Sequence, residues 1–108
     1  MAYRLSDKKC KKLMRRLYFL LKTKKIHVCF KRIGQNNGET DYKIIYLDPR
    51  EDILATAIHE LLHIELRQNT EKEIKKLEEG IMNTISHWQA RHFLQKLIKR
   101  MPKNYKLM

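Results

Sequence analysis

The stretch that most constrains the fold of this chain is Ala55–Leu66, which reads A-T-A-I-H-E-L-L-H-I-E-L. Its apolar residues are Ile58, Leu61, Leu62, Ile64 and Leu66. They are spaced so that a helix here would be buried on almost every side. The same stretch carries His59, Glu60 and His63. Because a buried polar group costs free energy unless it has a partner, these three side chains require partners or a ligand.

His59-Glu60-x-x-His63 is an H-E-x-x-H motif. Two histidines four residues apart lie on the same face of a helix, so both can bind one Zn²⁺ ion. Glu60 would then take a proton from a zinc-bound water, whose pKa the metal lowers toward neutral. A chain of this composition would contain the motif about 0.02 times by chance. The alternative is a core helix whose histidines only form hydrogen bonds with the backbone.

A catalytic zinc has three protein ligands, and a carboxylate on the next helix is the simplest third one. The candidates are Glu71, Glu73, Glu78 and Glu79. The turn before Thr70 is short, so we expect the flanking helices to pair antiparallel. The metal would lie about 10 Å back from that turn, level with residues 77–79. Glu78 also lies close to the apolar stripe of its helix, so it is the predicted ligand. Glu71 lies on the same side, and is either the ligand, if the turn is looser, or a second partner.

The segments before the motif are predicted as one helix and two strands. Ser6 is a good N-cap for a helix that ends near Thr23, with apolar residues at helical spacing. Residues 26–30 and 42–47 are β-branched and aromatic, and the turn-forming segment 34–38 lies between them. We therefore predict a β-hairpin, with 42–47 as a partly exposed edge strand.

After the motif helix, predicted over about 50–67, the sequence indicates two further helices. Thr70 with Glu73, and Ser86 with Gln89, have the spacing of capping boxes. Gly80 would allow a close approach to a neighbouring segment. An amphipathic pattern then continues to Pro102, and residues 102–108 are expected to form a loose tail. The predicted fold class is α+β, as one domain over residues 1–108.

Composition indicates a folded chain that does not cross a membrane. Hydrophobic residues make up 43% of the 108 residues, and no apolar run approaches the roughly 20 residues of a transmembrane helix. We recognise no signal peptide, so a cytoplasmic location with reduced cysteines is expected. The net charge of +12 is concentrated at the two ends. Residues 1–38 carry 12 basic and 1 acidic residues, whereas 80–108 carry 6 basic and none acidic. These ends could bind nucleic acid or an acidic partner, or form a solvated lysine-rich surface.

The predicted order is a helix, a β-hairpin, the H-E-x-x-H helix and a helix with a glutamate. This order resembles the minimal core of the zincin metallopeptidases, of the gluzincin type. T-A-I-H-E-L-L-H-I and Leu77-Glu78-Glu79-Gly80-Ile81 resemble segments of small metallopeptidases of phage and bacteria. The resemblance spans roughly residues 26–86. It implies that His59, His63 and Glu78 bind zinc and that Glu60 is the base. It also implies a peptide cleft beside an edge strand, here 42–47. The expected location is the cytoplasm of a bacterial or phage-infected cell.

The sequence departs from that pattern at Glu65, where zincin helices usually have an uncharged residue. The expected activity is zinc-dependent hydrolysis of a peptide or protein substrate. An oxyanion donor is also expected, with Tyr46, His87 and His92 as candidates. A lone histidine in a strand, His27, is more often structural than a ligand. The alternative function is a basic module that binds nucleic acid or a partner and has a structural zinc site without turnover.

Overall fold

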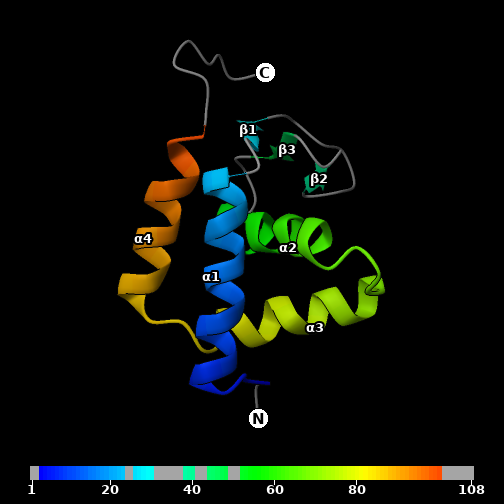
Figure 1. The fold of residues 1–108 in the computed structure, drawn as a ribbon, viewed down its shortest axis with the longest axis vertical. Coiled ribbons are helices and arrows are strands. Elements are labelled where there is room, and N and C mark those ends of the chain that lie inside the picture. The colour runs from blue at the N-terminus through cyan, green and yellow to red at the C-terminus, as the bar shows by residue number, and fades with distance from the viewer. Residues whose placement is uncertain (1–2, 24–25, 31–37, 41–43, 49–51, 101–108) are drawn as a thin grey trace.

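The computed structural model describes residues 3–23, 26–30, 38–40, 44–48 and 52–100. Its elements, in chain order, are α1 (Asp7–Thr23), β1 (His27–Phe30), β2 (Gly38–Thr40), β3 (Ile44–Leu47), α2 (Ile53–Glu65), α3 (Glu71–Met82) and α4 (His87–Ile98). The fold is therefore α+β, as predicted (Figure 1). No helix in the described part of the chain is long and apolar enough to cross a membrane. The predicted tail, 102–108, lies outside the described residues.

The described strands form one sheet in the order β1-β3-β2. β3 pairs parallel with β1 and antiparallel with β2. The predicted hairpin between 26–30 and 42–47 is therefore wrong. The sequence analysis missed β2, because Gly38-Glu39-Thr40 has two residue types that are depleted in strands. β2 takes the antiparallel position beside β3, and the 13 residues between β1 and β3 are long enough to bring the chain back parallel.

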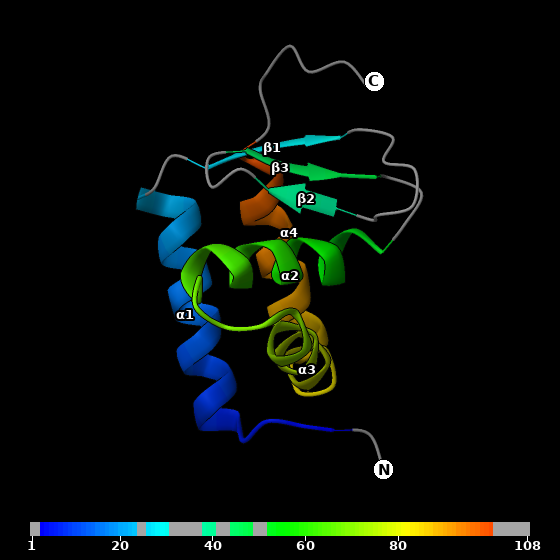
Figure 2. The same cartoon turned by 90° about the vertical axis from the view of Figure 1, so that its right-hand side faces the viewer.

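The position of β3 in the sheet also differs from the prediction. β3 is the central strand, with a neighbour on each side, whereas the sequence analysis placed 42–47 at an edge. The antiparallel edge is β2, and both β2 and β3 contact α2. Val28, Ile45 and Leu47 are fully buried, consistent with one face of the sheet packing on the helices (Figure 2). The strand that borders α2 at the sheet edge is therefore β2.

α2 is the most central helix of the fold, since it contacts α1, α3, β2 and β3. Its apolar residues Ala57, Ile58, Leu61 and Leu62 are completely buried. α1 contributes a buried face of six residues, from Cys10 to Leu21, at the helical spacing that the sequence predicted. α4 packs on α1 through Phe93 and Leu97, which are both fully buried. The predicted burial of the motif helix on nearly all sides is thus confirmed.

Local capping signals begin each helix where the sequence indicated, apart from α2. The Oγ of Ser6 accepts a hydrogen bond from the Lys9 amide at the start of α1. Capping boxes are present at Thr70 and Ser86. α2 begins at Ile53, because the carboxylate of Asp52 accepts from the Ala55 amide and so acts as the N-cap. The motif helix is therefore shorter at both ends than the predicted 50–67.

Gly80 makes the close approach that the sequence analysis expected. A Cβ atom at this position would lie 2.8 Å from Cγ of Leu5 and 2.8 Å from Cε2 of Tyr3. Leu5 has little freedom to move, because it is buried and its amide donates a hydrogen bond to Oγ1 of Thr84. The segment before α1 is thereby held against α3.

We predict that Gly80→Ala destabilises the protein. The added methyl group must displace a buried leucine, which costs about 1–3 kcal/mol. Alanine's better helix propensity offsets at most about 1 kcal/mol of this. Urea unfolding should give a lower midpoint for Gly80→Ala, while Glu79→Ala, at an exposed neighbouring position, should leave it nearly unchanged. Equal midpoints for Gly80→Ala and the parent would contradict the close packing.

Candidate metal centre

The motif residues lie on α2 at different depths. The side chain of His59 is 13% exposed and that of His63 is 27% exposed. Glu60 is buried, with 7% of the residue exposed. The two imidazoles therefore lie at the boundary between the core and solvent, and the carboxylate between them in sequence lies deeper. An ion could reach this position from solvent without the core having to open.

The two imidazoles face each other through their Nε2 atoms. Nε2 of His63 lies 3.1 Å from Nε2 of His59. The carboxylate of Glu71, the first residue of α3, bridges them, with Oε1 2.7 Å from Nε2 of His59 and Oε2 2.6 Å from Nε2 of His63. One ligand atom from each of these three residues fits within a 4.8 Å span. Two nitrogens and a carboxylate are a ligand set typical of zinc.

Glu78 approaches His59 from the other side of the ring. Its Oε1 lies 2.7 Å from Nδ1 of His59. The predicted third ligand, Glu78, is therefore not the carboxylate that joins the two Nε2 atoms here, whereas the predicted alternative, Glu71, is. A carboxylate on Nδ1 fixes the orientation of the ring and leaves Nε2 for a ligand, as in carboxylate–histidine–zinc arrangements.

The crossing of α2 and α3 explains the difference between Glu71 and Glu78. The sequence analysis assumed an antiparallel pair, which would put residue 71 near the turn and residue 78 level with the histidines. Figure 2 shows α2 lying across the view and α3 almost end-on, so the axes cross steeply. The link after Glu65 leads the chain back toward the middle of α2, and α3 begins there. The first residue of α3 is consequently level with His59 and His63.

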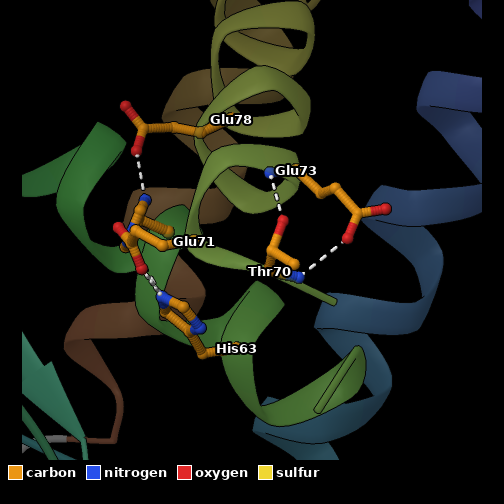
Figure 3. Close-up of polar contacts among 6 residues, drawn as sticks. His63, Thr70, Glu71, Glu73 and Glu78 are labelled. Carbon is orange, nitrogen blue, oxygen red and sulfur yellow. Dashed lines mark hydrogen bonds and ion pairs between the residues drawn. The ribbon is translucent and has the colours of Figure 1, made fainter. Parts of the chain in front are cut away.

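The capping box of α3 holds Glu71 in position. Oγ1 of Thr70 accepts from the Glu73 amide at 3.2 Å, and Oε1 of Glu73 accepts from the Thr70 amide at 2.8 Å (Figure 3). The hydrogen bond from the Thr70 amide lowers the pKa of the Glu73 carboxyl. Glu71 follows the cap directly, where the helix dipole favours a negative charge. In Figure 3, Glu71 and Glu78 both extend from α3 toward α2, with Glu71 reaching His63.

His59 is the electrostatic centre of the group. The hydrogen bond that Nδ1 of His59 donates to the Glu78 carboxylate raises the pKa of His59 above its ordinary value. Burial lowers it by less, and the negative charges of Glu71, Glu78 and Glu60 raise it further. The Glu60 carboxylate is therefore close enough for its charge to act on the ring. In the absence of a metal, these carboxylates favour the imidazolium form.

The hydrogen-bonding pattern fits a cation among these atoms. If Nδ1 of His59 donates to Glu78, the neutral ring has a lone pair on Nε2. That lone pair would face an oxygen of Glu71 at 2.7 Å and a nitrogen of His63 at 3.1 Å. Either a proton or a metal must relieve this contact. Tetrahedral zinc places two ligand nitrogens about 3.3 Å apart, close to the separation of the two Nε2 atoms. The donor set therefore fits Zn²⁺.

Other residues singled out in the sequence have surroundings of their own. His92 packs edge-on against Tyr18 of α1, and His87 stands beside Trp88 at the start of α4. Tyr46 is on the face of β3 opposite to the buried Ile45 and Leu47. Which of the three, if any, serves as an oxyanion donor stays a prediction. His27 is exposed on β1, outside the cluster.

Glu65, which departs from the zincin pattern, has a partner on α1. Its Oε1 accepts a hydrogen bond from Nε of Arg16 at 2.7 Å. This ion pair joins the last residue of α2 to α1 and accounts for a charge on an otherwise apolar helix. The sequence analysis missed the pair, because the partners are 49 positions apart in the sequence and no local signal indicates their contact.

No family model matches this sequence, and no curated protein or solved structure matches it either.

We predict a raised pKa for His59 in chelator-treated protein. NMR titration of its ring protons should give a value above 6.5, and Glu78→Gln should lower it, because the charged acceptor is removed. The imidazolium contributes stability that is fully present below the unfolded value of about 6.5 and is lost as the pH rises through the higher folded value. Glu79→Gln, outside the cluster, is the control. An unchanged His59 pKa in Glu78→Gln would contradict the assigned contact.

Proposed function

We propose that this chain is a zinc-dependent peptidase. In this proposal His59, His63 and Glu71 bind the metal, Glu78 orients His59 and Glu60 is the general base. The observation that carries it is the convergence of two Nε2 atoms and one carboxylate, with a second carboxylate on Nδ1 of the same histidine. This arrangement supports Glu71 as the third ligand in place of Glu78.

The number and exposure of the ligands favour catalysis over a structural site. Structural zinc almost always has four protein ligands, whereas catalytic zinc keeps a position for water or substrate. The described residues group three ligating side chains. The side chain of Glu71 is 54% exposed, so solvent and substrate can approach from that side. The alternative, a structural zinc without turnover, is less well supported.

The proposed chemistry assigns each residue a separate task. When bound, zinc would polarise the scissile carbonyl and lower the pKa of the attacking water. Glu60 takes the proton of that water and delivers it to the leaving amine. Its burial supports this assignment, because a base shielded from bulk water keeps the proton within the site. Glu78 holds the His59 ring by Nδ1, so that Nε2 remains directed at the ligand position.

The substrate peptide would lie along β2. This strand forms the antiparallel edge of the sheet and contacts α2. An extended peptide could add to that edge through main-chain hydrogen bonds, which favours a broad range of sequences. The architecture thus supports a zincin-like core, with β2 taking the role that the sequence analysis gave to 42–47.

We predict that Glu71→Ala abolishes stoichiometric zinc binding. Glu78→Ala should keep the ion but weaken its binding about 10- to 100-fold, as loss of an orienting carboxylate does. Elemental analysis and a competition titration with a chromophoric chelator would measure both. Glu79→Ala, which removes an exposed acid on the same helix, is the matched control. The reverse result, with zinc lost only in Glu78→Ala, would return the ligand role to Glu78.

The test of the enzymatic proposal is Glu60→Gln. This variant should retain zinc and lose hydrolysis of unfolded casein by at least about 100-fold, because general base catalysis contributes that much or more. Peptide release would be followed by mass spectrometry, with circular dichroism to confirm folding. A zinc-loaded Glu60→Gln variant as active as the parent would exclude Glu60 as the base. A zinc-loaded parent that cleaves no peptide would support the structural alternative.

A further inference from the structure

A groove between α1 and α4 lies away from the metal centre. Two adjoining hollows form it, and Tyr18 and His92 line both. Figure 1 shows α4 on one side of α1 and the start of α3, which carries Glu71, on the other. We call this feature the α1–α4 groove. Its walls are Tyr18 and Lys22 on one side, and the exposed face of α4 from Trp88 to Lys99, with Arg100, on the other.

One half of the groove is strongly basic. It contains Lys22, Lys96, Lys99 and Arg100. None of the described residues that line the two hollows is acidic. Along the sequence, residues 80–108 contain six basic residues and no acidic one. Arg100 is partly structural, since its Nη2 donates to the Lys22 carbonyl and ties α4 to the end of α1. The complementary ligand is a polyanion.

The other half of the groove presents aromatic rings. Trp88 is 71% exposed, an unusual state for so large an apolar side chain. The guanidinium of Arg91 lies 5.6 Å from its ring centroid, and the His92 ring meets Tyr18 edge-on at 5.4 Å. Rings beside cations are the combination by which proteins bind unpaired bases together with their phosphates. Trp88 and Lys99 are about 16 Å apart along α4, enough for several nucleotides.

The position of the exposed apolar residues argues against a membrane as the occupant. Phe19 and Ile98 are 59% and 58% exposed, but neither lines the groove. Phe19 follows the groove residue Tyr18, and Ile98 precedes the groove residue Lys99. One position along a helix corresponds to a rotation of about 100°, so each side chain is turned away from its neighbour in the groove. A surface that inserts into lipid would need these side chains on the same face as Trp88. The groove is instead bordered by the polar Gln89 and Gln95.

We propose that the α1–α4 groove binds single-stranded nucleic acid, with Trp88 stacking on a base and Lys96 and Lys99 contacting phosphates. In a duplex, stacking of neighbouring base pairs covers the faces on which an aromatic ring would stack. The site is independent of the metal centre, so chelation of zinc should not weaken it. It gives the chain a second binding surface in addition to the proposed peptidase site.

The single tryptophan of the chain provides a direct test. Addition of the oligonucleotide (dT)12 at 50 mM salt should quench Trp88 fluorescence. Trp88→Ala should weaken binding of fluorescein-labelled (dT)12 about 5- to 150-fold by anisotropy, the range for loss of one stacked base. Because Trp88 is mostly exposed, circular dichroism should be unchanged. Binding should persist in chelator, which separates this result from any failure of the proposed peptidase.

Charge variants distinguish the groove from general attraction. Lys96→Gln with Lys99→Gln should reduce the slope of log affinity against log salt by about 0.7 for each lysine. The matched control is Lys9→Gln with Lys12→Gln, two exposed positions on the side of α1 away from Tyr18. Equal losses in both pairs would overturn the proposal. It would also be overturned by unchanged Trp88 emission with (dT)12, by equal binding of a duplex, or by a response only to phosphatidylserine vesicles.

Discussion

The contact between His59 and two carboxylates is the interaction on which the candidate site depends. Glu78 meets Nδ1 and Glu71 meets Nε2, so one ring is held from both sides. A neutral imidazole cannot donate from both nitrogens. Two carboxylates on one ring therefore favour its protonated form, and a metal on Nε2 would take the place of that proton. The rest of α2 is mostly apolar and buried, so a polar ring on this helix costs free energy unless it has partners. The carboxylates of α3 are those partners.

Those partners are brought to His59 by two features of α3. The capping box at Thr70 determines where the helix begins, and hence that Glu71 is its first residue. The steep crossing with α2 then places that first turn over the histidines (Figure 2). Glu71 and Glu78 are seven residues apart, so they lie on the same side of α3 and reach the same ring.

The charge distribution divides the chain into an acidic middle and two basic ends. Acidic residues gather in the segment 39–79, which includes the proposed ligands and Glu60. Basic residues dominate the two ends of the chain, and α1 and α4 bring the ends together as neighbouring helices. A cation site and a polyanion groove can therefore coexist in a small protein. α4 lies on one side of α1 and the start of α3 on the other (Figure 1).

Helices, the caps of α1, α3 and α4, and the histidine pair on α2 were determined by the sequence alone, because each depends on residues within about one turn of one another. His59 and His63 share a face through helical periodicity, and the boxes at Thr70 and Ser86 span three residues. Only tertiary structure decided the strand order and the carboxylate that meets Nε2. β2 has weak strand propensity and depends on its neighbour β3. The choice between Glu71 and Glu78 depends on the angle between α2 and α3. The short link between these helices contains no residue pattern that indicates this angle.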